Sequence, residues 1–445
     1  MSTDQTAATL EALRRGDLAG ARTLRLTGLS EVPRELFGLA DTLEVLDLGG
    51  GTLTDLPADF GRLRRLRVLF GSGNRFARLP PVLGDCPALS QIGCRGAGVQ
   101  EVPAEALPPA LRWLTLTDNR IEALPARLGA LPRLQKVLLA GNRLRALPAS
   151  LAGAPNLELL RLAANAFEAL PPWLAGMPAL AWLSWAGNPF EPATPPAGAP
   201  GIPWADLEIG DCLGEGASGR VHRALRRRPD GAEPVALKLF KGAMTSDGLP
   251  EREMEACLAA GRHPNLPGAL GRLTGHPEGV QGLVMPLLPA SWRALAGPPS
   301  QESCSRDVYA PNLALDPASA LRLARAAAAA AAHLHGQGLL HGDLYAHNLL
   351  WDGQGDAQGD GQGGAAVLSD FGAASRLPPT PAGEAYRRIE VRSWGILLGE
   401  LLDRCREPPP REAALRALER ACTQPEVAAR PTMRQVLDAL PAEAG

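Results

Sequence analysis

An asparagine returns at a constant spacing through the first part of this 445-residue chain. The series consists of Asn74, Asn119, Asn142, Asn165 and Asn188. The last four are 23 residues apart, and the first keeps the phase if one unit is a residue shorter. A unit of this length cannot bury its own apolar face, so several units must stack to form a core. The repeat therefore predicts a solenoid in which asparagine side chains bond the backbone along each turn.

The asparagines close frames of the form LxxLxLxxN, which are complete at Asn119 and Asn165, and a Leu–Pro step follows most turns. Over residues 20–190 this pattern resembles the leucine-rich repeat family. The resemblance implies an α/β solenoid, or horseshoe, with short parallel strands such as 44–48 and 67–71 on its concave face. Gly51 and Ala97 stand where asparagine is expected, so we expect the early turns to be less regular.

The concave face of such a solenoid would carry aromatic side chains together with basic ones. They are Arg67, Phe70, Arg112, Trp113, Lys136, Arg161 and Trp182. Exposed aromatic residues beside arginine are typical of protein-binding surfaces, so we expect a protein partner or substrate to bind here. The alternative is that these are scattered surface residues without a shared role.

Changes of pattern divide the chain into three parts. Residues 1–190 form the predicted solenoid, with a short amphipathic cap helix near the N-terminus. Residues 191–204 are rich in proline and read as an extended linker. From residue 205 to 445, strand-like runs come first and helical runs later, which fits an α+β domain with two lobes. Within it, the glycine-rich stretch 353–364 predicts a flexible hairpin loop.

The segment HGDLYAHN at 341–348 is followed at a short interval by Asp-Phe-Gly at 370–372. Asp343 supplies a candidate base, while Asn348 and Asp370 supply two oxygen ligands for a metal on neighbouring loops. Phosphoryl transfer from a magnesium nucleotide needs this combination, because the site must position the attacking hydroxyl and neutralise charge on the phosphates.

A glycine-rich segment between two predicted strands has the form GxGxxGxV. It contains Gly214, Gly216, Gly219 and Val221. Glycine lets backbone amides approach phosphate without a Cβ in the way. The motif alone is weak, but here a strand follows it where a dinucleotide-binding fold would have a helix.

Lys238 ends the apolar run Val-Ala-Leu-Lys that begins at Val235 and includes Ala236, and a lysine there requires a partner. Glu253 on the following helix fits best, with Glu255 as the second choice. Further on, Met285 would border an adenine pocket. Backbone groups near Pro286 and Leu288 would bind the edge of the base, and Leu287 between them is a further candidate contact.

Together these motifs resemble the eukaryotic-type protein kinase family over residues 205–440, in the family's order. The resemblance implies ATP and Mg²⁺ as cofactors and a bilobal kinase-like fold. By position, Asp343 would accept the substrate proton, and Asn348 and Asp370 would hold Mg²⁺. Lys238 would bind the α- and β-phosphates. Leucine-rich repeats joined to a kinase in one chain are a known combination within this family.

The family pattern is broken at several positions. Gly342 replaces the arginine that usually precedes the catalytic aspartate, so the domain is of the non-RD type and control by loop phosphorylation is not expected. Tyr345 stands where Ser/Thr kinases have lysine. The activation segment is short and lacks its usual glutamate, for which Glu384 is the candidate partner of Arg430. Glu390 replaces an aspartate at the start of the central helix.

Three functions fit these observations. The first is an active protein kinase, most simply one for serine and threonine, whose repeats recruit a partner or substrate. The second is a small-molecule kinase, because aminoglycoside and choline kinases also carry His-Gly-Asp. The third is a pseudokinase scaffold, although the lysine and both aspartates are retained.

Composition excludes some classes of partner. The net charge of −2 favours neither nucleic acid nor an anionic membrane, and a mean hydropathy of −0.05 comes without an apolar run that could span a bilayer. The N-terminal residues lack the apolar stretch of a signal peptide. Seven cysteines without a CxxC pair fit a reducing, cytoplasmic compartment. The abundance of Arg, Ala, Gly and Pro over Lys indicates a GC-rich, bacterial genome.

Overall fold

The computed structural model describes residues 3–191, 200–216, 218–242, 244–245, 247–353 and 366–441. Most of the predicted proline-rich linker (192–199) and of the predicted glycine-rich loop (354–365) lies outside the described residues. By their contacts the residues form two compact units. The first is Met1–Leu174 with Asn188–Phe190, and the second is Ala175–Gly187 with Glu191–Gly445.

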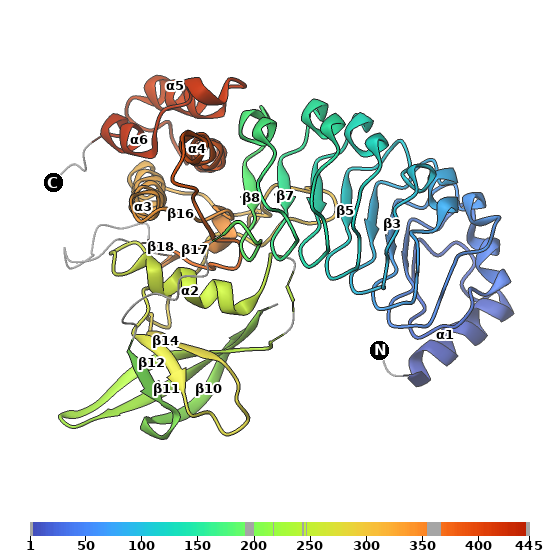
Figure 1. Ribbon diagram of the computed structural model, residues 1–445, viewed down its shortest axis with the longest axis horizontal. Coiled ribbons are helices and arrows are strands. Elements are labelled where there is room, and N and C mark those ends of the chain that lie inside the picture. The colour runs from blue at the N-terminus through green and yellow to red at the C-terminus, as the bar shows by residue number, and fades with distance from the viewer. Residues whose placement is uncertain are drawn as a thin grey trace. The chain divides into compact units, whose positions relative to one another are not determined.

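The first unit is a stack of short parallel strands joined by 3-10 turns, as the repeat predicted (Figure 1). Helix α1 (Thr3–Arg15) precedes them. The strands are β1 (Thr23–Arg25), β2 (Val45–Asp47), β3 (Val68–Phe70), β4 (Gln91–Gly93), β5 (Trp113–Thr115), β6 (Lys136–Leu138) and β7 (Leu159–Arg161). The 3-10 helices are η1 (Arg34–Leu39), η2 (Phe60–Arg62), η3 (Pro81–Asp85), η4 (Ala104–Ala106), η5 (Ala126–Ala130), η6 (Ala149–Gly153) and η7 (Pro172–Gly176).

The repeated asparagines bond the backbone of neighbouring turns. Nδ2 of Asn142 donates to the carbonyl oxygens of Leu116 and Leu139, both at 2.9 Å, and its Oδ1 accepts from the amide of Ile121 at 3.1 Å. This arrangement satisfies polar groups that stacking removes from water. At Gly51 an added Cβ would lie 2.2 Å from the carbonyl oxygen of Leu29, so no asparagine fits there.

The second unit contains a six-stranded sheet in the order β10–β11–β12–β14–β13–β9. The strand-like runs predicted after residue 205 are present as β10 (Leu207–Glu215), β11 (Gly219–Arg228) and β12 (Gly231–Phe240). The remaining members are β13 (Gly271–Thr274), β14 (Gly282–Pro286) and β9 (Gly201–Pro203). β9 pairs in parallel with β13, although the sequence placed it in the linker; all other pairs in this sheet are antiparallel.

Helices make up most of the rest of this unit. They are α2 (Pro250–Ala260), α3 (Pro317–Gly336), α4 (Pro381–Leu402), α5 (Glu412–Thr423) and α6 (Met433–Ala439). The short strands are β8 (Trp182–Ser184), β15 (Arg293–Ala294), β16 (Leu339–Leu340), β17 (Leu349–Trp351), β18 (Ala366–Leu368) and β19 (Ser375–Arg376), and the short 3-10 helices are η8 (Trp204–Asp206), η9 (Ala346–Asn348) and η10 (Val427–Ala429). α4 begins at Pro381, directly after the segment that follows Gly372.

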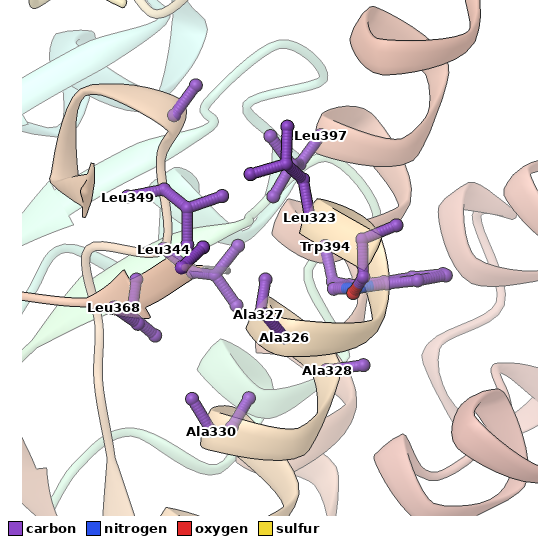
Figure 2. Packing of buried hydrophobic residues seen from close by; sticks show 14 of the residues in the cluster. Leu323, Ala326, Ala327, Ala328, Ala330, Leu344, Leu349, Leu368, Trp394 and Leu397 are labelled. Carbon is purple, nitrogen blue, oxygen red and sulfur yellow. The ribbon is translucent and has the colours of Figure 1, made fainter. Parts of the chain in front are cut away.

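Alanines on α3 form the centre of the core of this unit (Figure 2). Ala327, Ala328 and Ala330 are fully buried, and their small side chains let α4 approach closely enough for the indole Nε1 of Trp394 to donate to the carbonyl oxygen of Ala324 at 2.9 Å. Leu344 packs on the same core from the loop that carries Asp343, and Leu349 and Leu368 do so from β17 and β18. Among the described residues, no helix is long and apolar enough to cross a membrane.

Candidate active site

A two-stranded pairing joins the two loops that carry the predicted metal ligands. β17 and β18 are antiparallel, with Leu349 opposite Leu368, so the residues just outside the pair, Asn348 and Ser369, are neighbours. The amide and Oγ of Ser369 both donate to the carbonyl oxygen of Asn348, at 2.8 and 2.9 Å. His341, fully buried, contacts the carbonyl oxygen of Ser369 through Nε2 at 3.1 Å. These bonds place Asp370 beside the loop that holds Asn348.

Asp343 and Asn348 are in direct contact. Nδ2 of Asn348 donates to Oδ2 of Asp343 at 2.7 Å and to its carbonyl oxygen at 2.9 Å. The amide of Asp343 donates to Nδ1 of His341 at 3.3 Å. The candidate base is thus oriented by both ends of its own loop.

His347 and Asp307 form a second pair next to this base. Nδ1 of His347 donates to Oδ1 of Asp307 at 2.7 Å, and its Nε2 lies 3.8 Å from Oδ2 of Asp343. Burial disfavours the charged imidazole, but the hydrogen bond with Asp307 and the charge of Asp343 outweigh it, so the pKa of His347 is raised above 6.5. Asp307 could not be predicted from the sequence, because it lies far from every motif in a segment without regular structure.

We expect Asp307→Asn to lower the pKa of His347. Burial lowers this pKa, and the variant removes the charge of Asp307 that counteracts the effect of burial. A raised pKa in the folded state means that the charged pair stabilises the fold below about pH 6.5 and that this stability is lost as the pH rises through the raised pKa. NMR titration of the imidazole nitrogens would measure it, with Asp41→Asn, an exposed carboxylate in the repeats, as control. An unchanged His347 titration in Asp307→Asn would contradict the assignment.

Lys238 is paired with Glu253 in the structure. Nζ of Lys238 donates to Oε1 of Glu253, with the two side chains only 14% and 4% exposed. Burial disfavours the ammonium ion, but the charges of Glu253 and Asp370 outweigh it and raise the pKa of Lys238. The second choice, Glu255, pairs instead with Arg252 on the same helix at 2.8 Å. A charged amine is therefore held beside Asp370.

The glycine-rich turn covers a small cavity of about 140 Å³. Its predicted lining residues are Gly214, Gly216, Gly219, Val221, Lys238 and Asp370. Around Gly214 and Gly216 an added Cβ would meet nothing within 4 Å, so their backbone is open to a ligand. Gly219 differs, because an added Cβ would lie 2.4 Å from the carbonyl oxygen of Leu239; this glycine is required by strand pairing.

Three further residues line this cavity that the sequence did not point to, and they are Ser218, Thr245 and Asp247. Gly372 of the Asp-Phe-Gly motif also lines it. Thr245 and Asp247 come from the loop between β12 and α2, which carries no motif and no periodicity. No sequence signal could have placed them under the glycine-rich turn.

The predicted adenine-contacting residues lie on neighbouring strands. Ala236 pairs with Met285 across β12 and β14, one residue away from the Leu237–Val284 pair. Met285 packs against the cluster of Phe240, Met254 and Leu283. Leu287 and Leu288 follow the end of β14 and do not line the cavity under the glycine-rich turn.

Glu390, on α4, is bonded to the loop that carries the candidate base Asp343. Its Oε1 accepts from the amide of Gly342 at 2.7 Å and its Oε2 accepts from Nε2 of His335 at 2.8 Å, while the side chain is 1% exposed. Gly342 has a φ of +74°, and an added Cβ would lie 2.7 Å from the carbonyl oxygens of both Ala373 and Leu183. An arginine cannot occupy this position in this conformation.

The predicted pair of Glu384 and Arg430 is wrong. Glu384 pairs with Arg387 and Arg388, at 3.0 and 3.5 Å. Arg430, fully buried, instead donates to backbone carbonyl oxygens of Gln424 at 2.9 Å, Arg388 at 3.3 Å and Pro178 at 2.7 Å. Burial and the nearby charge of Arg392 lower its pKa to about 10.

Three residues assigned to the partner-binding face are not on an open surface. Trp182 is 1% exposed because it stacks on Tyr345. Lys136 is 9% exposed, with its ammonium group 4.0 Å from the centre of the Trp113 ring, and Arg161 is 1% exposed. These residues occupy the same strand positions of their repeats as the more accessible ones, so the sequence does not predict which of them are buried. Arg67 is exposed, and Phe70, Arg112 and Trp113 are half-buried.

The donor set fits a hard divalent cation. Asp370, with a φ of +63°, is exposed to the cavity, and its Oδ1 accepts only from the amide of Gly372 at 3.0 Å among the described groups. Asn348 uses its Nδ2 on Asp343, which leaves its amide oxygen for another contact. Carboxylate and amide oxygens are ligands that Mg²⁺ accepts.

Comparison with known families agrees with this geometry. A model described as protein tyrosine and serine/threonine kinase matches residues 207–388, and one described as leucine rich repeat matches residues 109–167. The first match begins at β10 and ends within α4, so it includes the glycine-rich turn, Lys238, Asp343 and Asp370. No curated protein matches the chain.

Proposed function

Since the chain carries a leucine-rich repeat region and a protein kinase domain, we propose that it transfers the γ-phosphoryl group of ATP to serine or threonine in a protein. Two arrangements of the site support catalysis over a scaffold role. Lys238 is paired with Glu253, and Asp343 is bonded to Asn348 on a loop tied to Asp370. A pseudokinase has no need to keep both arrangements.

Asp343 is the proposed base. Its carboxylate would accept the proton of the attacking hydroxyl while Asn348 fixes its orientation. Lys238 would bind the α- and β-phosphates, because its ammonium group is kept charged by Glu253 and by Asp370. Gly214 and Gly216 would offer backbone amides to the phosphates.

Asn348 and Asp370 are the proposed metal-binding residues. When bound, Mg²⁺ would neutralise charge on the phosphates. Adenine is proposed to bind between the glycine-rich strands and the end of β14. The residues proposed to contact it are Val221, Ala236, Met285, Leu287 and Leu288.

We further propose that activity does not depend on a phosphorylated activation segment, as in kinases of the non-RD type. Gly342 leaves no arginine to receive a phosphate at this position. The segment between Gly372 and α4 has only two hydroxyl side chains, Ser375 and Thr380, and that of Ser375 is buried. The segment therefore offers few hydroxyl groups whose phosphorylation could switch the activity on.

For the repeats, we propose binding of a protein partner or substrate through the strand face that remains accessible. Arg67, Phe70, Arg112 and Trp113 are its candidate contacts. Their mixture of aromatic and guanidinium groups is typical of protein-binding surfaces. The proposal of a cytoplasmic location rests on cysteine usage alone.

Lys238→Met is expected to lower phosphate transfer about a hundredfold, because one fixed positive charge on the phosphates is lost. Transfer from labelled ATP to a general protein acceptor in the presence of Mg²⁺ would measure it. Lys136→Met, a buried lysine of the repeats, is the matched control. Nucleotide binding by the wild type without any transfer would replace the kinase proposal by the scaffold alternative.

A further inference from the structure

The strand β8 and its flanking turns belong to the second unit by their contacts, although their sequence continues the repeats. We call Ala175–Gly187 together with Glu191 the last repeat. Its contacts fall on three parts of the kinase domain: the catalytic loop, the segment after Asp-Phe-Gly, and Arg430 near the C-terminus. None of these contacts is explained by a role in binding an external partner.

Trp182 contacts the catalytic loop. Its indole lies parallel to the ring of Tyr345, with centroids 4.2 Å apart and an interplanar angle of 4°. Its Nε1 donates to the carbonyl oxygen of Leu344 at 3.0 Å. Leu344 and Tyr345 directly follow Asp343, so the indole holds the backbone on which the candidate base is mounted. Stacked rings and a buried hydrogen bond together restrict that backbone.

The neighbouring residue Leu183 occupies the space next to Gly342. Its carbonyl oxygen would lie 2.7 Å from a Cβ at that position. In kinases regulated by phosphorylation, new arginine–phosphate pairs order the activation loop. Here the carbonyl oxygen of Leu183, in the last repeat, blocks the space that the Cβ of an arginine at position 342 would need.

Trp185 and Glu191 hold the segment that follows Asp-Phe-Gly. The amide of Trp185 donates to Oγ of Ser375 at 2.9 Å, and its Nε1 donates to the carbonyl oxygen of Arg376 at 3.1 Å. Oε1 of Glu191 accepts from the amide of Arg376 at 2.8 Å. The segment is therefore bonded through both its backbone and its buried hydroxyl.

The last repeat also accepts hydrogen bonds from the guanidinium groups of Arg430 and Arg392. The carbonyl oxygen of Pro178 accepts from Nη2 of Arg430 at 2.7 Å, and that of Ala179 accepts from Nε of Arg392 at 3.1 Å. No carboxylate among the described residues pairs with Arg430. The backbone of the last repeat thus takes over part of the role that the absent glutamate of the activation segment would have.

We propose that the last repeat is a permanent positioning element of the phosphotransfer site and takes the place of activation-segment phosphorylation. Trp182 is its main positioning residue, acting through Leu344 and Tyr345 on Asp343. It does not line the cavity under the glycine-rich turn. The inference rests on the proposed kinase function for its catalytic readout, but its structural content stands on the contacts alone.

The test uses the full chain with Trp182→Leu and Trp182→Phe. Trp173→Leu, a half-buried tryptophan on η7, is the matched control. We expect Trp182→Leu to lower kcat about tenfold with the KM for ATP changed less than twofold, because a small displacement of the base slows transfer without touching the nucleotide site. Trp182→Phe, which keeps the ring contact and loses the indole N–H, should fall between it and the wild type.

Hydrogen–deuterium exchange gives a second readout that needs no activity. Peptides covering 340–348 should exchange faster in Trp182→Leu and remain unchanged in Trp173→Leu. Unchanged kcat and unchanged exchange in Trp182→Leu would overturn the inference. If Trp182→Leu does not fold, the same comparison is made with Trp182→Phe.

Two outcomes separate this inference from the proposed function. If the wild type binds ATP but transfers no phosphate, the kinase proposal fails, and exchange in 340–348 alone decides whether Trp182 holds the loop. If the wild type is active, its rate should survive complete dephosphorylation by a phosphatase. Loss of activity on dephosphorylation would contradict a permanent element that replaces phosphorylation.

Discussion

Asp343→Asn is expected to reduce the rate of phosphate transfer about a thousandfold, the usual range for loss of a general base. The amide has nearly the shape of the carboxylate. It can still accept the hydrogen bond from Asn348, which is 2.7 Å long in the wild type. It cannot take the proton of the attacking hydroxyl. Nucleotide affinity should change little, because Lys238 and the glycine-rich turn are untouched.

Single-turnover transfer and equilibrium nucleotide binding, measured on the same preparation, would check this prediction. Asp230→Asn, in the exposed turn between β11 and β12, is the matched control and should behave as the wild type. A decrease below tenfold in Asp343→Asn would mean that another group, or water, removes the proton.

The second large effect concerns Gly342. Gly342→Arg restores the family's usual residue, yet we expect it to lower the free energy of unfolding by about 3 kcal/mol and to abolish activity. The backbone there has a φ of +74°, which costs a residue with a Cβ about 1–2 kcal/mol. The side chain would also meet the carbonyl oxygens of Leu183 and Ala373, both 2.7 Å from its Cβ, and overpacking adds about 1–3 kcal/mol.

Gly338→Arg separates the two causes. Gly338 belongs to the same unit and has a φ of +71°, but no atom lies within 4 Å of an added Cβ. Thermal unfolding should therefore show a smaller decrease in the melting temperature for Gly338→Arg than for Gly342→Arg. Equal decreases would show that crowding by Leu183 and Ala373 has no effect.

The repeats and the first strands after residue 205 could be predicted because they rest on short-range patterns. The 23-residue spacing of asparagine reflects hydrogen bonds such as those of Asn142, which each unit repeats. The strands β10 to β12 follow from apolar runs interrupted by glycine. The pairing of Lys238 with Glu253, placed by motif order, is present in the structure.

The rest depends on contacts that a sequence does not display. Trp113 and Trp182 occupy the same position of their repeats, but only Trp182 stacks on Tyr345. A carboxylate was predicted as the partner of Arg430, but the guanidinium group donates to backbone carbonyl oxygens. Because every residue has a carbonyl oxygen, the sequence gives no indication of which residues are the partners. The start of α4 at Pro381 is not marked by an apolar run, although proline is favoured in the first turn of a helix.

We propose that this chain phosphorylates serine or threonine in proteins by means of Asp343. The most direct test of this proposal is transfer from γ-labelled ATP with Mg²⁺ to a protein acceptor, followed by identification of the phosphorylated amino acid. We expect phosphoserine or phosphothreonine from the wild type and almost none from Asp343→Asn. Label in the protein that is equal for both forms, or no label while ATP remains bound to the wild type, would contradict it.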